Sequence, residues 1–360
     1  MVVLKYLDHT VDQQKGSSRT LMHREEQPRQ PHHGDQITQV LPTTPVPQHS
    51  KEQSPALNTS ALRELTPSNL RRTRPTFWAM VQHLFVFILL GSALIGFFYF
   101  FIKTRIGQRL DEISFTEFSY QLTDYQQPTE RILNFIPTVA AISAVIGLFF
   151  VIIWKHRFVP SLIGLSIAIC SYISAYLLKY HLITKPDYGI QEAVLNSAPS
   201  GHTTVAAAAG SALFLAAPKK LRPLVALISA ILTTATGFST IVNGWHRPAD
   251  VITAVLLVSL WTVIGLAILR FVRSEELDMS NTQRSGLILI PLLNIAGFFL
   301  GFCSLALYAI TIYSPFPGCA LSAATCMILT VISFSTSWLV ALLRPQNKVR
   351  SPYYTKVWTY

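Results

Sequence analysis

The chain has 360 residues, of which 50% are hydrophobic and only 13% are charged, and its formal net charge at pH 7 is +11. So apolar and charge-poor a composition excludes an ordinary soluble protein of this length. The positive charge does not indicate nucleic-acid binding, because the basic residues cluster in short segments between apolar blocks, as in membrane proteins.

Residues 1–75 differ from the rest of the chain. They are rich in Gln, Pro, Ser, Thr and His and poor in aromatic residues, without sustained periodicity, which predicts a disordered tail. A cleavable signal peptide is not expected, because the first long apolar run begins only near Phe77. His32 and His33 are interpreted as part of this solvated low-complexity segment rather than as metal ligands.

Eight apolar blocks follow, each about twenty residues long, which is the length that a helix needs to cross a bilayer. The sequence therefore predicts an all-α, polytopic membrane bundle, with a six-helix core and two further C-terminal helices. The predicted spans are 77–102, 132–154, 158–179, 200–217, 223–242, 250–272, 286–310 and 319–343.

Clusters of basic residues occur in every second segment between these spans, which places the clusters on one side of the membrane, and the alternating loops carry fewer basic residues without another explanation. By the positive-inside rule that side is the cytoplasm, so the sequence predicts a cell-membrane protein with both termini in the cytoplasm. The loops 103–131, 180–199, 243–249 and 311–318 would then face outward. The basic residues of the predicted cytoplasmic segments are Arg71, Arg72, Arg74, Lys155, Arg157, Lys219, Lys220, Arg222, Arg270, Arg273, Arg284, Arg344, Lys348 and Arg350.

The outward loop 103–131 is long and mixed in charge. Two interpretations stay open for it. Either its Phe115, Phe118 and Tyr120 lie along the membrane surface, or the segment is a plain connector.

The string Pro199-Ser200-Gly201-His202 stands at the start of the fourth span. Free backbone N–H groups at a helix start favour an anion, and Gly201 lets phosphate oxygens approach the backbone. Ser200 is predicted either to cap the helix or to donate to a phosphate oxygen. His202 is either a functional group or an ordinary interfacial side chain.

A second string, Gly244-Trp245-His246-Arg247-Pro248-Ala249-Asp250, opens the sixth span. Pro248 suits the first turn of a helix, and Asp250 can reach back four residues to the imidazole of His246. A carboxylate that fixes the tautomer leaves the other ring nitrogen free as a nucleophile. The alternative is a helix-capping Asp beside an interfacial His.

The predicted topology brings the two strings together. Span four runs inward and span five runs outward, so His202 and His246 return to one outer face although 44 residues separate them. The end of span three brings Lys179 to that face, and the loop after it brings Lys185. Two histidines and two lysines at one mouth predict phosphoryl chemistry at a membrane surface.

In this order the residues resemble the type 2 phosphatidic acid phosphatase superfamily, whose motifs are K-x6-R-P, P-S-G-H and S-R-x5-H-x3-D. The resemblance covers roughly residues 77–272, with the second motif complete and the third present as Ser239, His246 and Asp250. It implies that His246 attacks phosphorus to form a phosphohistidine and that Asp250 orients it. It also implies that His202 protonates the leaving oxygen.

The chain departs from the family in the groups that would hold the phosphoryl oxygens. The first motif reads Lys179, five residues, then Lys185-Pro186, so Lys replaces Arg and the bidentate fork is lost. The third motif has Thr240 in place of Arg, and Arg247 is predicted to supply the missing cation; the surrounding Trp-His-Arg-Pro segment is similar to that of actinobacterial members. The predicted phosphate-binding residues are Lys179, Lys185, Ser200, Gly201 and Arg247, and neither a metal nor another cofactor is expected.

Other features lie outside these motifs. Cys170, Cys303, Cys319 and Cys326 show no metal spacing and are interpreted as small apolar fillers. Gly297 and Gly301 form a G-x-x-x-G, which marks either a homodimer face or packing within the chain. The predicted division of the chain is 1–75 tail, 76–273 phosphatase core, 274–350 two additional helices and 351–360 C-terminal tail.

The predicted function is that of an integral membrane lipid phosphate phosphatase with an extracytoplasmic active site. Its substrate would be phosphatidate, phosphatidylglycerophosphate, a polyprenyl (pyro)phosphate or a polyprenyl-phosphosugar. One alternative is a phosphotransferase that passes the phosphoryl group to a lipid or sugar alcohol. The other is a membrane protein that binds a lipid phosphate and has lost turnover, as the replacement at Thr240 would allow.

Overall fold

The computed structural model describes residues 77–191, 195–273, 277, 284–314 and 316–343. All described residues belong to one compact unit, Pro67–Tyr360. The predicted disordered tail at 1–75 and its two histidines lie outside the described residues.

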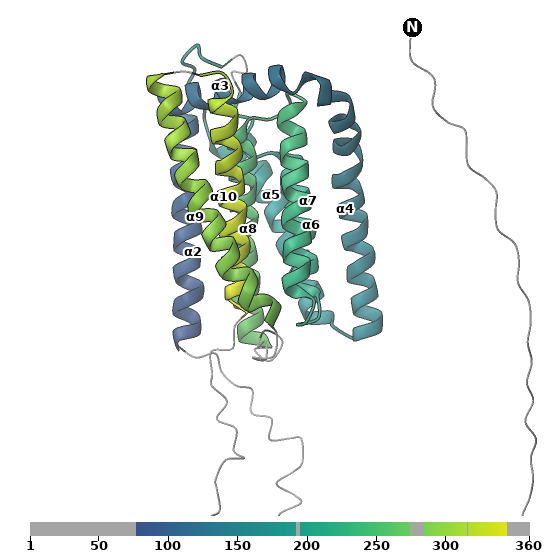
Figure 1. The fold of residues 1–360 in the computed structure, drawn as a ribbon. Coiled ribbons are helices and arrows are strands. Elements are labelled where there is room, and N and C mark those ends of the chain that lie inside the picture. Colours follow the sequence, from purple (N-terminus) through teal and green to yellow (C-terminus); the bar gives the residue numbers. More distant parts are fainter. Residues whose placement is uncertain (1–76, 192–194, 274–276, 278–283, 315, 344–360) are drawn as a thin grey trace, which may run out of the picture. The chain divides into compact units, whose positions relative to one another are not determined.

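The described part of the chain is helical and contains no strand, which confirms the predicted all-α fold. The helices α2 and α4 to α10 run alongside one another, and α3 lies across one end of the bundle (Figure 1). The α-helices are α2 (Phe77–Phe97), α3 (Arg105–Gln121), α4 (Gln126–Lys155), α5 (Phe158–Leu177), α6 (Gly201–Ala216), α7 (Arg222–Val242), α8 (Pro248–Val272), α9 (Arg284–Tyr313) and α10 (Cys319–Ala341), and the π-helices η2 (Phe98–Ile102) and η4 (Leu178–Leu182) prolong α2 and α5.

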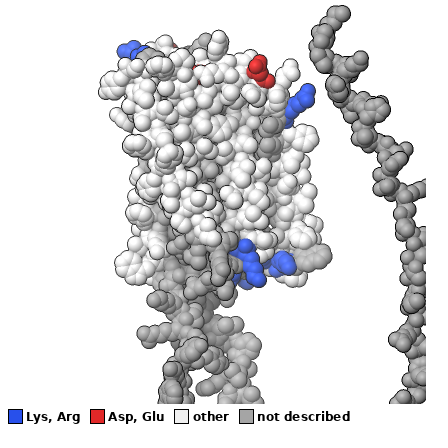
Figure 2. Space-filling view, viewed as in Figure 1, with Lys and Arg blue, Asp and Glu red and all other residues white. Residues whose placement is uncertain are grey.

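The helices are those of a multi-pass membrane protein. Six are long and apolar enough to cross a membrane, and the apolar parts of α4 and α6, Pro137–Ile153 and Gly201–Ala216, are shorter. These two lie alongside the other six (Figure 1), so the helices follow the eight predicted spans closely, except that α4 begins earlier than predicted. Figure 2 shows the charged side chains of one face at the two ends, with an uncharged belt between them.

Most of the segment 103–131, which was predicted to be a loop, is helical. The side chain of Thr104 caps α3 by accepting a hydrogen bond from the Gly107 N–H at 3.0 Å. Residues three or four positions apart, such as Gly107, Leu110, Ser114 and Phe118, form the buried face of α3. Its charged residues keep its hydropathy below that of a membrane span, so a search for apolar blocks passes over it.

The aromatic residues of α3 have different surroundings. Phe118 is buried against Phe238 of α7, with ring centroids 6.0 Å apart, and Phe115 lies under the guanidinium of Arg247. Tyr120 is exposed. Of the three aromatic residues predicted to lie along the membrane surface, Phe118 is therefore packed inside the bundle instead, because α3 packs onto its end.

The two C-terminal helices pack against each other, and α10 also contacts α3, α7 and α8. A Cβ added at Gly297 would lie 3.0 Å from Phe334, and one at Gly301 would lie 3.4 Å from Thr330. Both neighbours belong to α10, so the G-x-x-x-G serves packing within the chain, which is one of its two predicted uses. The four cysteines are free and partly buried.

Candidate active site

Two helix N-termini meet at the end of the bundle that α3 covers. Helix α6 begins after Ser200, and α8 begins after Arg247. The Ser200 N–H donates to the backbone carbonyl of Asp250 at 2.9 Å, which joins the two helix starts directly. The structure therefore places the Pro-Ser-Gly-His string and the second histidine string side by side.

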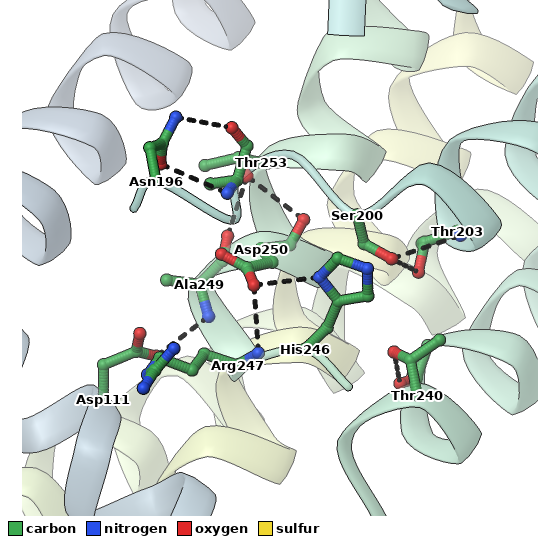
Figure 3. A network of polar contacts seen from close by, with 12 residues as sticks. Asp111, Asn196, Ser200, Thr203, Thr240, His246, Arg247, Ala249, Asp250 and Thr253 are labelled. Atoms are coloured by element: carbon green, nitrogen blue, oxygen red, sulfur yellow. Dashed lines mark hydrogen bonds and ion pairs between the residues drawn. The ribbon is translucent and has the colours of Figure 1, made fainter. Parts of the chain in front are cut away.

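His246 is held by the carboxylate one turn into α8. Its Nδ1 lies 3.0 Å from Oδ2 of Asp250, and both residues are buried (Figure 3). The Asp250 carboxylate also accepts hydrogen bonds from the Arg247 N–H, at 3.0 Å, and from the side chain of Ser197. An ionised carboxylate at Nδ1 fixes the proton there and leaves the lone pair on Nε2. No other described residue forms a hydrogen bond to Nε2.

The turn before α8 fixes the position of His246. Gly244 has φ +70°, a conformation that favours glycine. The backbone carbonyl of Thr240 accepts hydrogen bonds from the Trp245 and His246 N–H groups at 2.9 and 3.2 Å. The Thr240 side chain is fully buried and bonds the Gly237 carbonyl at 2.7 Å. Thr240 therefore supports the turn through its backbone, and its side chain points into α7 rather than toward a phosphate.

Ser200 caps the N-terminus of α6, which is one of its two predicted roles. Its hydroxyl oxygen accepts from the Thr203 N–H at 3.4 Å and from the Thr203 hydroxyl at 3.0 Å (Figure 3). A Cβ added at Gly201 would meet no atom within 4 Å. The first N–H groups of α6 therefore border open space, where an anion fits.

His202 lies beside the turn that carries His246. Its ring centroid is 5.4 Å from that of Trp245, with the two planes at 48°. His202 is half-buried and lies within electrostatic reach of His246 and Lys179. Lys179 belongs to η4, and its ammonium lies 5.5 Å from the centre of the Tyr180 ring.

Lys185 is on a loop that is fastened to the α2–α3 corner. The Lys103 ammonium donates to the Thr184 hydroxyl at 2.9 Å, and Gln108 of α3 donates to the Pro186 carbonyl at 3.0 Å. Burial lowers the pKa of Lys185, and the positive charge of Arg247 lowers it further. The loop thus brings a second lysine close to the second histidine string.

Arg247 has a partner that the sequence did not predict. Its Nε donates to Glu112 of α3 at 2.7 Å, and its guanidinium lies 5.0 Å from the centre of the Phe115 ring. The neighbouring Asp111 accepts a hydrogen bond from the Ala249 N–H, at the first turn of α8, at 3.0 Å (Figure 3). Burial raises the pKa of Asp111 to about 8, and the negative charge of Asp250 adds to this effect.

Sequence reasoning therefore missed Gln108, Asp111 and Glu112. They recur at helical spacing, three and four residues apart, on the face of α3 that also carries Phe115. A search for amphipathic rather than apolar segments would have found this helix. Nothing within α3 reveals that its partners are the Lys185 loop and the start of α8.

A family model described as the PAP2 superfamily matches residues 179–273. The match begins at Lys179, so it is shorter than the predicted extent of 77–272, but it includes every predicted site residue. The predicted resemblance to this superfamily is confirmed over the matched segment. No curated protein and no solved structure matches the chain.

Proposed function

We propose that this chain is an integral membrane lipid phosphate phosphatase, which hydrolyses a phosphomonoester or pyrophosphate of a lipid through a phosphohistidine. The observation that carries the proposal is the 3.0 Å contact between His246 Nδ1 and the buried Asp250 carboxylate. The match to the PAP2 superfamily and the membrane-spanning helices support the wider class, a membrane protein of the phosphatase type.

In the first step, Nε2 of His246 attacks phosphorus, and the P–O bond to the lipid oxygen breaks. His202 donates a proton to the leaving oxygen, so the lipid departs as an alcohol. Asp250 stabilises the positive charge that develops on the imidazole. The first N–H groups of α6, at Gly201 and after, together with Lys179 and Lys185, stabilise the charge on the phosphoryl oxygens.

In the second step, a water molecule attacks phosphorus and the P–N bond to His246 breaks. His202, now neutral, accepts the proton of the water, and inorganic phosphate leaves. The chain returns to its starting protonation state, so one water molecule is consumed for each ester bond that is hydrolysed.

The test uses three variants of the purified full chain in detergent, each assayed on an alkyl and an aryl phosphate. His246→Ala is expected to abolish turnover of both substrates, because no covalent intermediate can form. His202→Ala should lower kcat for the alkyl ester about 10²- to 10⁴-fold, as expected for loss of a general acid. It should lower kcat for nitrophenyl phosphate much less, because that leaving group needs little protonation. The loss of kcat in Asp250→Asn should lie between the losses in His246→Ala and His202→Ala.

The exposed His181 of η4 provides a matched control, and His181→Ala should retain normal turnover of both esters. Trapping should yield an acid-labile phosphoprotein with the phosphate on His246. A His246→Ala protein that still hydrolyses phosphate would contradict the mechanism. Phosphate transferred to an added alcohol in preference to water would indicate a phosphotransferase, and binding without release would indicate a protein that has lost turnover.

A further inference from the structure

An apolar groove of about 350 Å³ lies between α4, α6 and α7. Ser143 and Val139 of α4, Ala206 and Ala209 of α6, and Ile228 and Leu232 of α7 are among its lining residues. The three helices contact one another pairwise. Several of the lining side chains are small, so the helices leave a channel here rather than a closed seam.

The groove continues the face of α6 that begins with His202. Ala206, Ala209 and Leu213 follow His202 by four, seven and eleven residues, which places all four on one side of a helix. On α7, Leu232 of the groove lies on the same side as Ser239 of the third motif, seven residues later. The polar residues at the site end of α6 and α7 and the apolar residues of the groove thus lie on the same faces of these two helices.

Above the groove, towards the candidate site, a hydrogen bond joins α4 and α7. The Asn243 side chain, at the end of α7, donates to the Thr129 hydroxyl of α4 at 3.1 Å. Below this bond the lining is apolar except for isolated serines. A bound molecule would therefore have its polar group beside His202 and its apolar part along α6.

The distance from the histidine to the far end of the groove suits one leaflet of a bilayer. On α6 the groove is lined from Ala206 to Leu213, and Leu213 follows His202 by eleven residues, which at 1.5 Å per residue is about 16 Å along the helix. The hydrocarbon core of a bilayer is about 30 Å thick, so a chain that starts beside His202 and ends at Leu213 would span about half of it. Its volume is at the lower end of the range for ligand pockets, about 300–1,000 Å³, which suits one chain rather than two.

We propose that this groove binds one hydrocarbon chain of the lipid whose phosphate reacts at His246. The inference rests on the proposed function and adds to it a binding site for the chain. Two other apolar cavities of the described residues are not lined by α6 and so lack this continuity with the histidines. The cavity between α2 and α8 lies beside His83 and Arg270, and the one between α2 and α9 is bordered by Phe97, Leu110 and Tyr308.

The inference can be tested by placing a large side chain in the groove at an exposed position. Ser143 is an exposed groove residue of α4, and Ser166 is an exposed serine of α5 outside the groove. Ser143→Trp and Ser166→Trp therefore make the same change on neighbouring helices. Each variant is assayed with a long-chain lipid phosphate in detergent micelles and with water-soluble nitrophenyl phosphate.

Ser143→Trp should lower kcat/KM for the long-chain substrate by about tenfold or more, which corresponds to about 1.4 kcal/mol. Its kcat/KM for nitrophenyl phosphate should stay within about twofold of the starting protein, and Ser166→Trp should leave both values unchanged. Ala209→Leu, which fills the groove from α6, should have the same selective effect as Ser143→Trp.

A photoreactive group in the chain of an alkyl phosphate gives a second readout, with cross-links expected on α4, α6 and α7. The inference would be overturned if Ser143→Trp lowered kcat/KM equally for both substrates or for neither, or if the cross-links were confined to other helices. The proposed function fails separately, if the starting protein releases no phosphate from any substrate. A photoreactive alkyl chain without a phosphate serves as the last control. If it cross-links to the groove and added lipid phosphate does not reduce this cross-linking, the occupant is an ordinary membrane lipid, and the inference is overturned.

Discussion

Arg247 is the residue whose surroundings depart most from the predicted role. It was expected to replace the arginine that the family has at Thr240, but it forms an ion pair with Glu112. This bond uses Nε, and no described residue bonds the two terminal nitrogens. Glu112 and Phe115 therefore hold the guanidinium through Nε and one ring face. We propose that the terminal nitrogens bind a phosphoryl oxygen, and that Glu112 positions Arg247 for this contact.

The paired roles of Arg247 and Glu112 lead to a graded prediction. Arg247→Ala should lower kcat about 10²- to 10³-fold, as the loss of a transition-state donor does elsewhere. Glu112→Gln should cost less, because an amide oxygen still accepts from Nε. Both should weaken inhibition by inorganic phosphate, a readout that a purely structural role would leave unchanged.

Glu117 offers the control on the same helix, since it accepts from the Leu321 N–H of α10 and is not among the residues that contact Arg247. Glu117→Gln should alter thermal stability without altering phosphate inhibition. If Arg247→Ala is silent in both assays, the lysines and the start of α6 alone hold the phosphate. Thr240→Arg is not expected to rescue Arg247→Ala, because the Thr240 side chain is fully buried.

Asp111 should make the stability of the protein depend on pH. Its pKa is about 8 in the folded chain, well above the usual range of a carboxyl group. Between the unfolded and folded pKa values the folded state binds the extra proton, so the free energy of unfolding falls as pH rises toward and through 8. Asp111→Asn keeps an acceptor for the Ala249 N–H and cannot ionise. Melting temperatures from pH 6 to pH 9 should therefore decline less in this variant, and parallel curves would show that Asp111 does not titrate in this range.

At the scale of the helices, the sequence predicted those features that depend on a local residue pattern. Apolar length located the spans, and Pro248 together with the Ser200 cap marked the starts of α8 and α6. The contact between His246 and Asp250 also followed from their spacing, because residues four apart meet on a helix. Each of these signals lies within one short segment of the chain.

The role of α3 could not be predicted in this way. Its bonds to Ala249 and Arg247 join residues 138 and 135 positions apart, and no local pattern carries such a pairing. In the fold, Gln108 supports the Lys185 loop, Asp111 the start of α8 and Glu112 the arginine. One amphipathic helix outside the matched segment 179–273 thus contacts three parts of the candidate site.

At the scale of the whole bundle, charge is divided unequally between the two ends. Every described Asp and Glu lies at the end that holds the candidate site, on α3, between α3 and α4, at the starts of α4 and α8, or in the Lys185 loop. The described charged residues of the opposite end are all basic. One of them, Arg222, is fully buried and bonds the carbonyls of Leu215 and Ala217 at the end of α6. Arg222 therefore caps the C-terminal end of α6, in addition to being one of the basic residues at this end of the bundle.

The predicted orientation places the end that carries only basic described charges in the cytoplasm and the histidines outside, and it stays a prediction. The prediction can be tested with single cysteines in a variant that lacks Cys170, Cys303, Cys319 and Cys326. Lys220→Cys lies in the exposed turn between α6 and α7, and Asp124→Cys lies in the exposed turn between α3 and α4. In intact cells an impermeant thiol reagent should label the cysteine at 124 and leave the one at 220 unlabelled until the membrane is opened. The reverse pattern would put His202 and His246 on the cytoplasmic side, where a lipid phosphate of the inner leaflet would be the substrate. Because α2 and α4 to α10 all connect the same two ends, one pair of cysteines, with one at each end, is enough to decide the orientation of the whole bundle.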